Sequence, residues 1–239
     1  MFTSSSLSAS SGNIGTASVS APRALSVKSG TEDHVTDGTT DIAIMALSPK
    51  EIVLNRGKTF EVTLKINDDV SLWGIFADVS FDADIFELIG CTAGNVFAES
   101  QFTMQEDLTK PSYRFLATLD TIDTISAKGD IVTLQFRIKE DAEDKDTEIS
   151  LRMVEGVGKD TPADIEKGSP VQVGVDNAAP VISGIKDGAT YYGDTVVTVS
   201  ESHLDSVTVN GERISVTEGK FTLTPAQSSQ TLVVTDKAG

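Results

Sequence analysis

Residues 72–94 constrain the fold of this chain more than any other stretch of its sequence. Along residues 74–81 every second side chain is apolar, which is the period of a β-strand that rests one face on a core. These inward positions are Ile75, Ala77, Val79 and Phe81. Asp82 and Asp84 then supply turn chemistry, because aspartate side chains bond to their own backbone, and a second apolar run, 85–89, follows. We therefore predict a long strand and its return within a β-sandwich.

Alternation of the same kind recurs along the chain, with turn residues between the segments and no helical period longer than two turns. Strands are expected at residues 60–66, 101–104, 113–119, 131–139, 149–153 and 171–175. Beyond residue 180 the strands become shorter, and Asn210-Gly211 is a strong signal for a two-residue hairpin with positive φ at both positions. Many strands without intervening helices indicate an all-β fold: a jelly-roll β-sandwich followed by a small Ig-like β-sandwich.

Composition divides the chain into three parts. Residues 1–40 are rich in Ser, Thr and Gly and are expected to form a flexible leader, because they offer too little apolar surface to offset the entropy of ordering. The jelly roll is expected over residues 41–176. The Ig-like sandwich is expected over residues 177–239, and we expect it to lack its last strand, which implies a fragment of a longer chain.

The chain is strongly acidic, with 36 acidic and 19 basic residues and a net charge of -17. Such a charge argues against nucleic acids and anionic membranes as partners, because their phosphates would be repelled. No run of about 18 apolar residues is present, so we expect no membrane insertion, and the N-terminus lacks the pattern of a signal peptide. Cys91 is the single cysteine and, alternating with apolar neighbours, is expected to be a small buried core residue.

Residue types needed for catalysis or metal binding do not gather in the sequence. The two histidines, His34 and His203, lie far apart, so a histidine-based metal site or nucleophile triad is not expected. The acidic run 140–148 lacks the mid-loop glycine and terminal glutamate of an EF-hand loop and is predicted to be a solvated turn. Asp120 and Asp123 resemble a glycosidase pair only by residue type. We therefore predict no enzyme activity, no catalytic residues, no metal and no cofactor.

The sequence from about residue 42 to residue 175 resembles the cohesin family, jelly-roll modules that bind dockerin domains on bacterial surfaces. The likeness is carried in order by residues 55–67, 79–90 and 129–139. The following part resembles the bacterial Ig-like modules that occur in tandem on surface proteins, on residues 179–188, 207–211 and 235–239.

The resemblance to cohesins implies where a partner would bind. In that family the dockerin helices lie on one flat sheet face, which corresponds here to residues 72–81, 101–105, 113–119 and 131–139. Alternation turns the following side chains outward on these strands: Gly74, Phe76, Asp78, Ser80, Arg114, Leu116, Thr118, Thr133 and Gln135. Phe76 and Leu116 are expected to be apolar anchors, with Asp78 and Arg114 as polar contacts around them. Phe76 departs from the family, in which a polar pair is often found at this place.

The implied function is non-catalytic docking of a dockerin-like helical module by a bacterial surface or secreted multi-domain protein, located outside the cell. Any calcium would belong to the dockerin partner rather than to this chain. Two alternatives are a purely structural spacer and a carbohydrate-binding or adhesin module. A glycan-binding module would need an exposed platform of aromatic side chains, for which the chain offers Trp73, Tyr113, Tyr191 and Tyr192.

Overall fold

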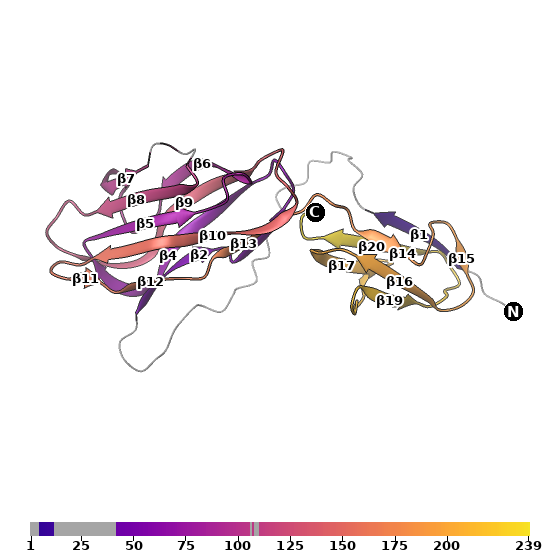
Figure 1. Cartoon of the computed structure of the whole chain (residues 1–239). Coiled ribbons are helices and arrows are strands. Elements are labelled where there is room, and N and C mark those ends of the chain that lie inside the picture. Colours follow the sequence, from indigo (N-terminus) through magenta and orange to yellow (C-terminus); the bar gives the residue numbers. More distant parts are fainter. Residues whose placement is uncertain (1–4, 12–41, 106, 108–109) are drawn as a thin grey trace. The chain divides into compact units, whose positions relative to one another are not determined.

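The computed structural model of the chain describes residues 5–11, 42–105, 107 and 110–239 (Figure 1). The chain divides into two compact units, one ending at Val175 and the other comprising Asp176–Gly239 together with strand β1 (Ser5–Ser11). Within the described residues the regular structure is β-strand, apart from one 3₁₀ turn at Glu99–Gln101. This confirms the predicted all-β fold class. The same residues contain no helix that is long and apolar enough to cross a membrane.

The unit ending at Val175 is a sandwich of two sheets. The first sheet has the order β3 (Glu51–Leu54), β13 (Val171–Val175), β10 (Lys145–Val157), β5 (Gly74–Ser80), β8 (Ser112–Thr118) and β7 (Phe102–Met104), with β11 (Pro162–Ala163) paired to β10. The second has the order β12 (Ile165–Lys167), β2 (Ala43–Ser48), β4 (Thr59–Leu72), β9 (Ile125–Ile138) and β6 (Phe86–Ala93). Strands far apart in sequence pair within each sheet, as expected for a jelly roll.

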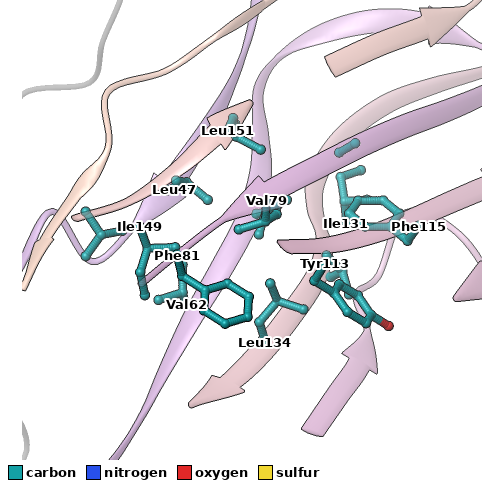
Figure 2. Close-up of a cluster of buried hydrophobic side chains, with 14 of the residues drawn as sticks. Leu47, Val62, Val79, Phe81, Tyr113, Phe115, Ile131, Leu134, Ile149 and Leu151 are labelled. Atoms are coloured by element: carbon teal, nitrogen blue, oxygen red, sulfur yellow. The ribbon is translucent and has the colours of Figure 1, made fainter. Parts of the chain in front are cut away.

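The core of this sandwich lies between the two sheets and is filled by the inward positions of the alternating strands (Figure 2). Phe136 is its aromatic centre, stacked on Phe60 at a ring distance of 5.5 Å and meeting Phe81 edge-on at 5.1 Å. Each such side chain stabilises the fold by about 1.5–3 kcal/mol through burial alone. Cys91, predicted to be a small buried core residue, is partly buried and packs against this core.

Two turns that the sequence predicts can be compared with the structure: the turn after β5 and the turn over residues 140–148. After β5, the Asp82 carboxylate accepts a hydrogen bond from the Asp84 amide at 3.0 Å, as its residue type predicts. Asp82 also accepts a hydrogen bond from Lys145 Nζ at 2.8 Å, which lowers the pKa of Asp82. Lys145 already belongs to β10, where it pairs with Val175. The predicted turn over residues 140–148 therefore ends earlier than expected.

The second unit consists of two smaller sheets. One has the order β15 (Thr190–Tyr191), β1, β20 (Gln230–Asp236), β17 (Leu204–Val209) and β18 (Glu212–Arg213); the other has the order β14 (Val181–Ser183), β16 (Thr195–Ser200) and β19 (Lys220–Leu223). The β17–β18 hairpin turns at Asn210 (φ 53°) and Gly211 (φ 84°), as the sequence predicts. The assignment of this unit as Ig-like stays a prediction.

The prediction of a flexible leader is wrong for residues Ser5–Ser11, because they form strand β1. It pairs in parallel with β20, from Leu7 opposite Gln230 to Ser11 opposite Val234, and in antiparallel fashion with β15. The alternation of apolar residues along β20 could not reveal this pairing, because no turn links the two strands. The rest of the predicted leader, including His34, lies outside the described residues.

Candidate functional site

The candidate site is the outer surface of strands β7, β8, β5 and β10. On β5 the inward side chains are fully buried: Ile75, Ala77 and Val79. The intervening residues Phe76 and Asp78 therefore belong to the outer surface. Antiparallel pairing aligns Phe76 with Leu116 of β8, and Asp78 with Arg114. The structure thus brings together four residues predicted to contact a partner, and Thr118 follows two positions after Leu116 on the same strand.

Strand β10 adds residues to this surface that the sequence did not lead us to expect there. Met153 pairs with Asp78, and Glu155 pairs with Phe76. The register shifts between Leu151 and Met153, so Arg152 is the additional residue of a β-bulge, a feature that redirects side chains locally. We call the combined surface the outer face: Gly74, Phe76, Asp78, Ser80, Thr103, Arg114, Leu116, Thr118, Arg152, Met153 and Glu155.

Apolar side chains remain uncovered on the outer face. Leu116 is 38% exposed and Met153 is 42% exposed, while Phe76 between the two strands is partly buried. Large apolar side chains grouped on a sheet surface are a usual mark of an interaction site. The outer face therefore has the apolar component that a protein partner would need.

The polar component of the outer face is centred on Asp78, which is almost fully buried at 1% exposure. Its Oδ2 atom lies 3.0 Å from Arg114 Nε and 2.7 Å from an Nη atom of Arg152. Its Oδ1 atom is also buried but has no hydrogen-bond partner among the described residues. The two guanidinium groups come from the strands on either side of β5, Arg114 from β8 and Arg152 from β10, and both contact the same oxygen of the Asp78 carboxylate.

Thr133 and Gln135 do not belong to this surface. Both lie on β9, which pairs with β4 and β6 in the opposite sheet. There the Thr133 hydroxyl forms a 2.9 Å hydrogen bond with the hydroxyl of Thr63. The prediction that they share a face with Phe76 is wrong, because alternation shows which side of a strand faces the core but not which sheet the strand joins.

Comparison with known protein families gives one decisive result. The family model described as "Cohesin domain" matches residues 45–175, which is more than half of the chain. This chain belongs to the cohesin family. The matched residues end where the first compact unit ends, and we refer to that unit as the cohesin unit. No curated protein sequence gave a match.

Solved structures similar to the chain are also cohesins. A cohesin of Clostridium acetobutylicum is 18% identical, with 58% of this chain and 93% of that chain covered and a TM-score of 0.48. A cohesin in a type I cohesin–dockerin complex of Clostridium thermocellum is 13% identical, with 57% and 100% covered and a TM-score of 0.49. A non-cellulosomal cohesin of the archaeon Archaeoglobus fulgidus is 14% identical, with 57% and 91% covered and a TM-score of 0.46.

One polar cluster lies in the second unit and was not foreseen. His203 Nδ1 lies 2.8 Å from Asp176 Oδ2, and the His203 amide donates to Glu201 Oε1 at 2.9 Å. Within the described residues this is the group whose carboxylate and imidazole atoms gather closely enough to hold a metal ion. The hydrogen bond between His203 and Asp176 joins the turn after β16 to the segment before β14.

The aromatic residues considered for glycan binding do not form a platform. Tyr113 is buried in the cohesin core, where burial raises the pKa of its hydroxyl. Trp73 is partly buried and donates from Nε1 to the carbonyl oxygen of Thr121 at 2.6 Å. Tyr191 and Tyr192 belong to the second unit. Among these four residues only Tyr192 is largely exposed, at 73%.

Proposed function

We propose that the outer face of the cohesin unit docks a dockerin-type helical module, and that the chain is a non-catalytic part of a bacterial surface or secreted multi-domain protein. The proposal places calcium, where present, on the partner module. Family membership supports a docking role for residues 45–175. The observation that carries the proposal is the exposure of two apolar side chains on either side of β5: Leu116, which is opposite Phe76, and Met153, which is opposite Asp78.

These side chains have the properties of binding anchors. Apolar area removed from water contributes about 25 cal/mol per Å², and interface energy is usually concentrated in a few central side chains. Leu116 and Met153 flank Phe76 and Asp78 on adjacent strands, so one helix laid across the sheet can cover them together. A helical partner fits the flat, strand-built surface better than a small ligand, for which a deep pocket is typical.

A binding assay with purified dockerin modules tests this function. We expect at least one module of a broad panel to bind the wild-type chain in biolayer interferometry. Leu116→Asp should weaken that binding at least ten-fold, a change of about 1.4 kcal/mol, while leaving thermal unfolding nearly unchanged. Phe76→Ala should act in the same direction.

The matched control is Ile122→Asp, which changes a side chain that is 81% exposed and belongs to the loop between β8 and β9 rather than to the outer face. It should bind like the wild-type chain. Wild-type affinity of both outer-face variants would place the partner on another surface, and failure of every module to bind would contradict the docking function itself.

A further inference from the structure

We infer that the partner presents a carboxylate side chain to Arg114 and Arg152, next to the apolar residue that covers Leu116. This inference rests on the proposed docking function and adds the chemistry by which the outer face would select its partner. The observation behind it is that both arginines contact the same oxygen of Asp78 and keep N–H donors for another acceptor.

Arg114 and Arg152 meet Asp78 through one shared carboxylate oxygen. An arginine usually binds a carboxylate through two parallel N–H···O bonds that use both oxygens. Here Arg114 and Arg152 both contact Oδ2, and the buried Oδ1 receives no hydrogen bond from the described residues. Neither guanidinium therefore forms a two-bond fork with Asp78. Each retains N–H donors for another acceptor, since a guanidinium carries five of them.

The two arginine side chains are far more exposed than the carboxylate that holds them. The side chains of Arg114 and Arg152 are 52% and 58% exposed, whereas that of Asp78 is 2% exposed. Asp78 thus acts as a buried positioning residue that holds two cations at the surface. Holding these long side chains in place beforehand reduces the entropy lost when a partner binds.

The charge around Arg114 and Arg152 differs from that of the chain as a whole. The chain as a whole carries a net charge of -17, which would repel an acidic partner segment at long range. On the outer face, however, the two arginines balance Asp78 and Glu155, and two cations face the single carboxylate of Asp78. A partner carboxylate is attracted at this point and repelled near Glu155, which pairs with Phe76 rather than with Asp78. The charge pattern therefore also orients the partner.

The spacing between Arg114 and Leu116 on β8 is close to the spacing of side chains one turn apart on a helix. Arg114 and Leu116 are two positions apart on β8, so their side chains emerge about 7 Å apart along the strand. Side chains at positions i and i+4 of a helix lie about 6 Å apart. A helix that places an acidic residue one turn from an apolar residue therefore matches Arg114 and Leu116 at once.

The experiment uses the full chain and the dockerin module that binds it best in the panel. Arg114→Lys/Arg152→Lys keeps both charges, so that Asp78 is not left as an unpaired buried charge, but it removes the fork geometry. We expect this variant to bind at least ten-fold more weakly, because a lysine ammonium cannot form two parallel N–H···O bonds with a partner carboxylate. Changing each Asp or Glu of the module to its amide should identify one residue whose loss weakens wild-type binding but adds little in the lysine variant.

The control is Arg137→Lys, a partly exposed arginine of β9 that pairs with Glu87 at 3.3 Å in the opposite sheet. It should bind like the wild-type chain. If the lysine variant binds with wild-type affinity while Leu116→Asp does not, the carboxylate inference falls and the docking function stands. If neither change affects binding, both proposals fail.

Discussion

The two compact units of this chain use the same strand chemistry but are stabilised differently. The cohesin unit encloses an extended core with several aromatic rings in contact. The buried apolar residues of the second unit are far fewer: Val197, Val199, Val207, Phe221, Leu223, Leu232 and Val234. A small domain buries a smaller fraction of its surface, so each remaining interaction contributes a larger share of its stability. Backbone pairing by β1, a strand distant in sequence, therefore matters more than it would beside a large core.

The largest expected effect comes from the centre of the cohesin core. Phe136→Ala removes a fully buried ring that contacts Phe60 and Phe81 and should lower the free energy of unfolding of the cohesin unit by about 3–5 kcal/mol. Scanning calorimetry would show this as a lower transition temperature for that unit. The matched change in the second unit is Phe221→Ala, which should remove a larger fraction of that unit's stability because its core is smaller. Equal fractional losses in the two units would contradict the view that they are stabilised differently.

A smaller effect is expected from breaking the β1–β20 pairing. Ala9→Pro removes a backbone N–H from β1 opposite Leu232 and should destabilise the second unit by about 0.5–1.5 kcal/mol, the usual contribution of one hydrogen bond. Amide hydrogen exchange of β20 should become faster, while exchange in the cohesin unit should not change. Ala9→Val keeps the N–H and is the control. Unchanged exchange in β20 after Ala9→Pro would show that β1 adds nothing to that sheet.

The smallest effect concerns Cys91, which reports on the cohesin unit alone. Burial raises the pKa of its thiol, so at about pH 8 a smaller fraction is in the reactive thiolate form than for an exposed cysteine. Alkylation by iodoacetamide should therefore be slower than for a model thiol, and its rate should rise with pH. Phe136→Ala should accelerate the reaction, whereas Ala9→Pro should not. An equal response to both variants would mean that the two units do not open independently.

The sequence predicts features that depend on neighbouring residues and misses those that depend on contacts between distant strands. The alternation of Ile75, Ala77 and Val79 predicts a strand and its buried side, because neighbouring side chains of a strand point to opposite faces. The same signal does not say which sheet a strand joins, which is why the prediction that Gln135 shares a face with Phe76 is wrong. Sheet membership depends on long-range pairing that no short pattern records.

The outer face illustrates the same limit. Regular alternation after Leu151 would turn Met153 inward, but the bulge at Arg152 leaves both Arg152 and Met153 exposed. A bulge adds one residue without changing the composition of the strand, so its position cannot be read from residue types. The resemblance to cohesins placed Phe76, Asp78, Arg114 and Leu116 on one face, and the structure brings these four residues together because β5 and β8 pair in regular register.

The pairing of β1 with β20 has a consequence for the synthesis of the protein. β1 leaves the ribosome before the cohesin unit, and β20 leaves it afterwards. At about 5–20 residues per second, roughly 10–40 s pass between the two events, which is ample time for the cohesin unit to fold first. During translation the cohesin unit can therefore fold while β1 still waits for β20, the strand with which it pairs.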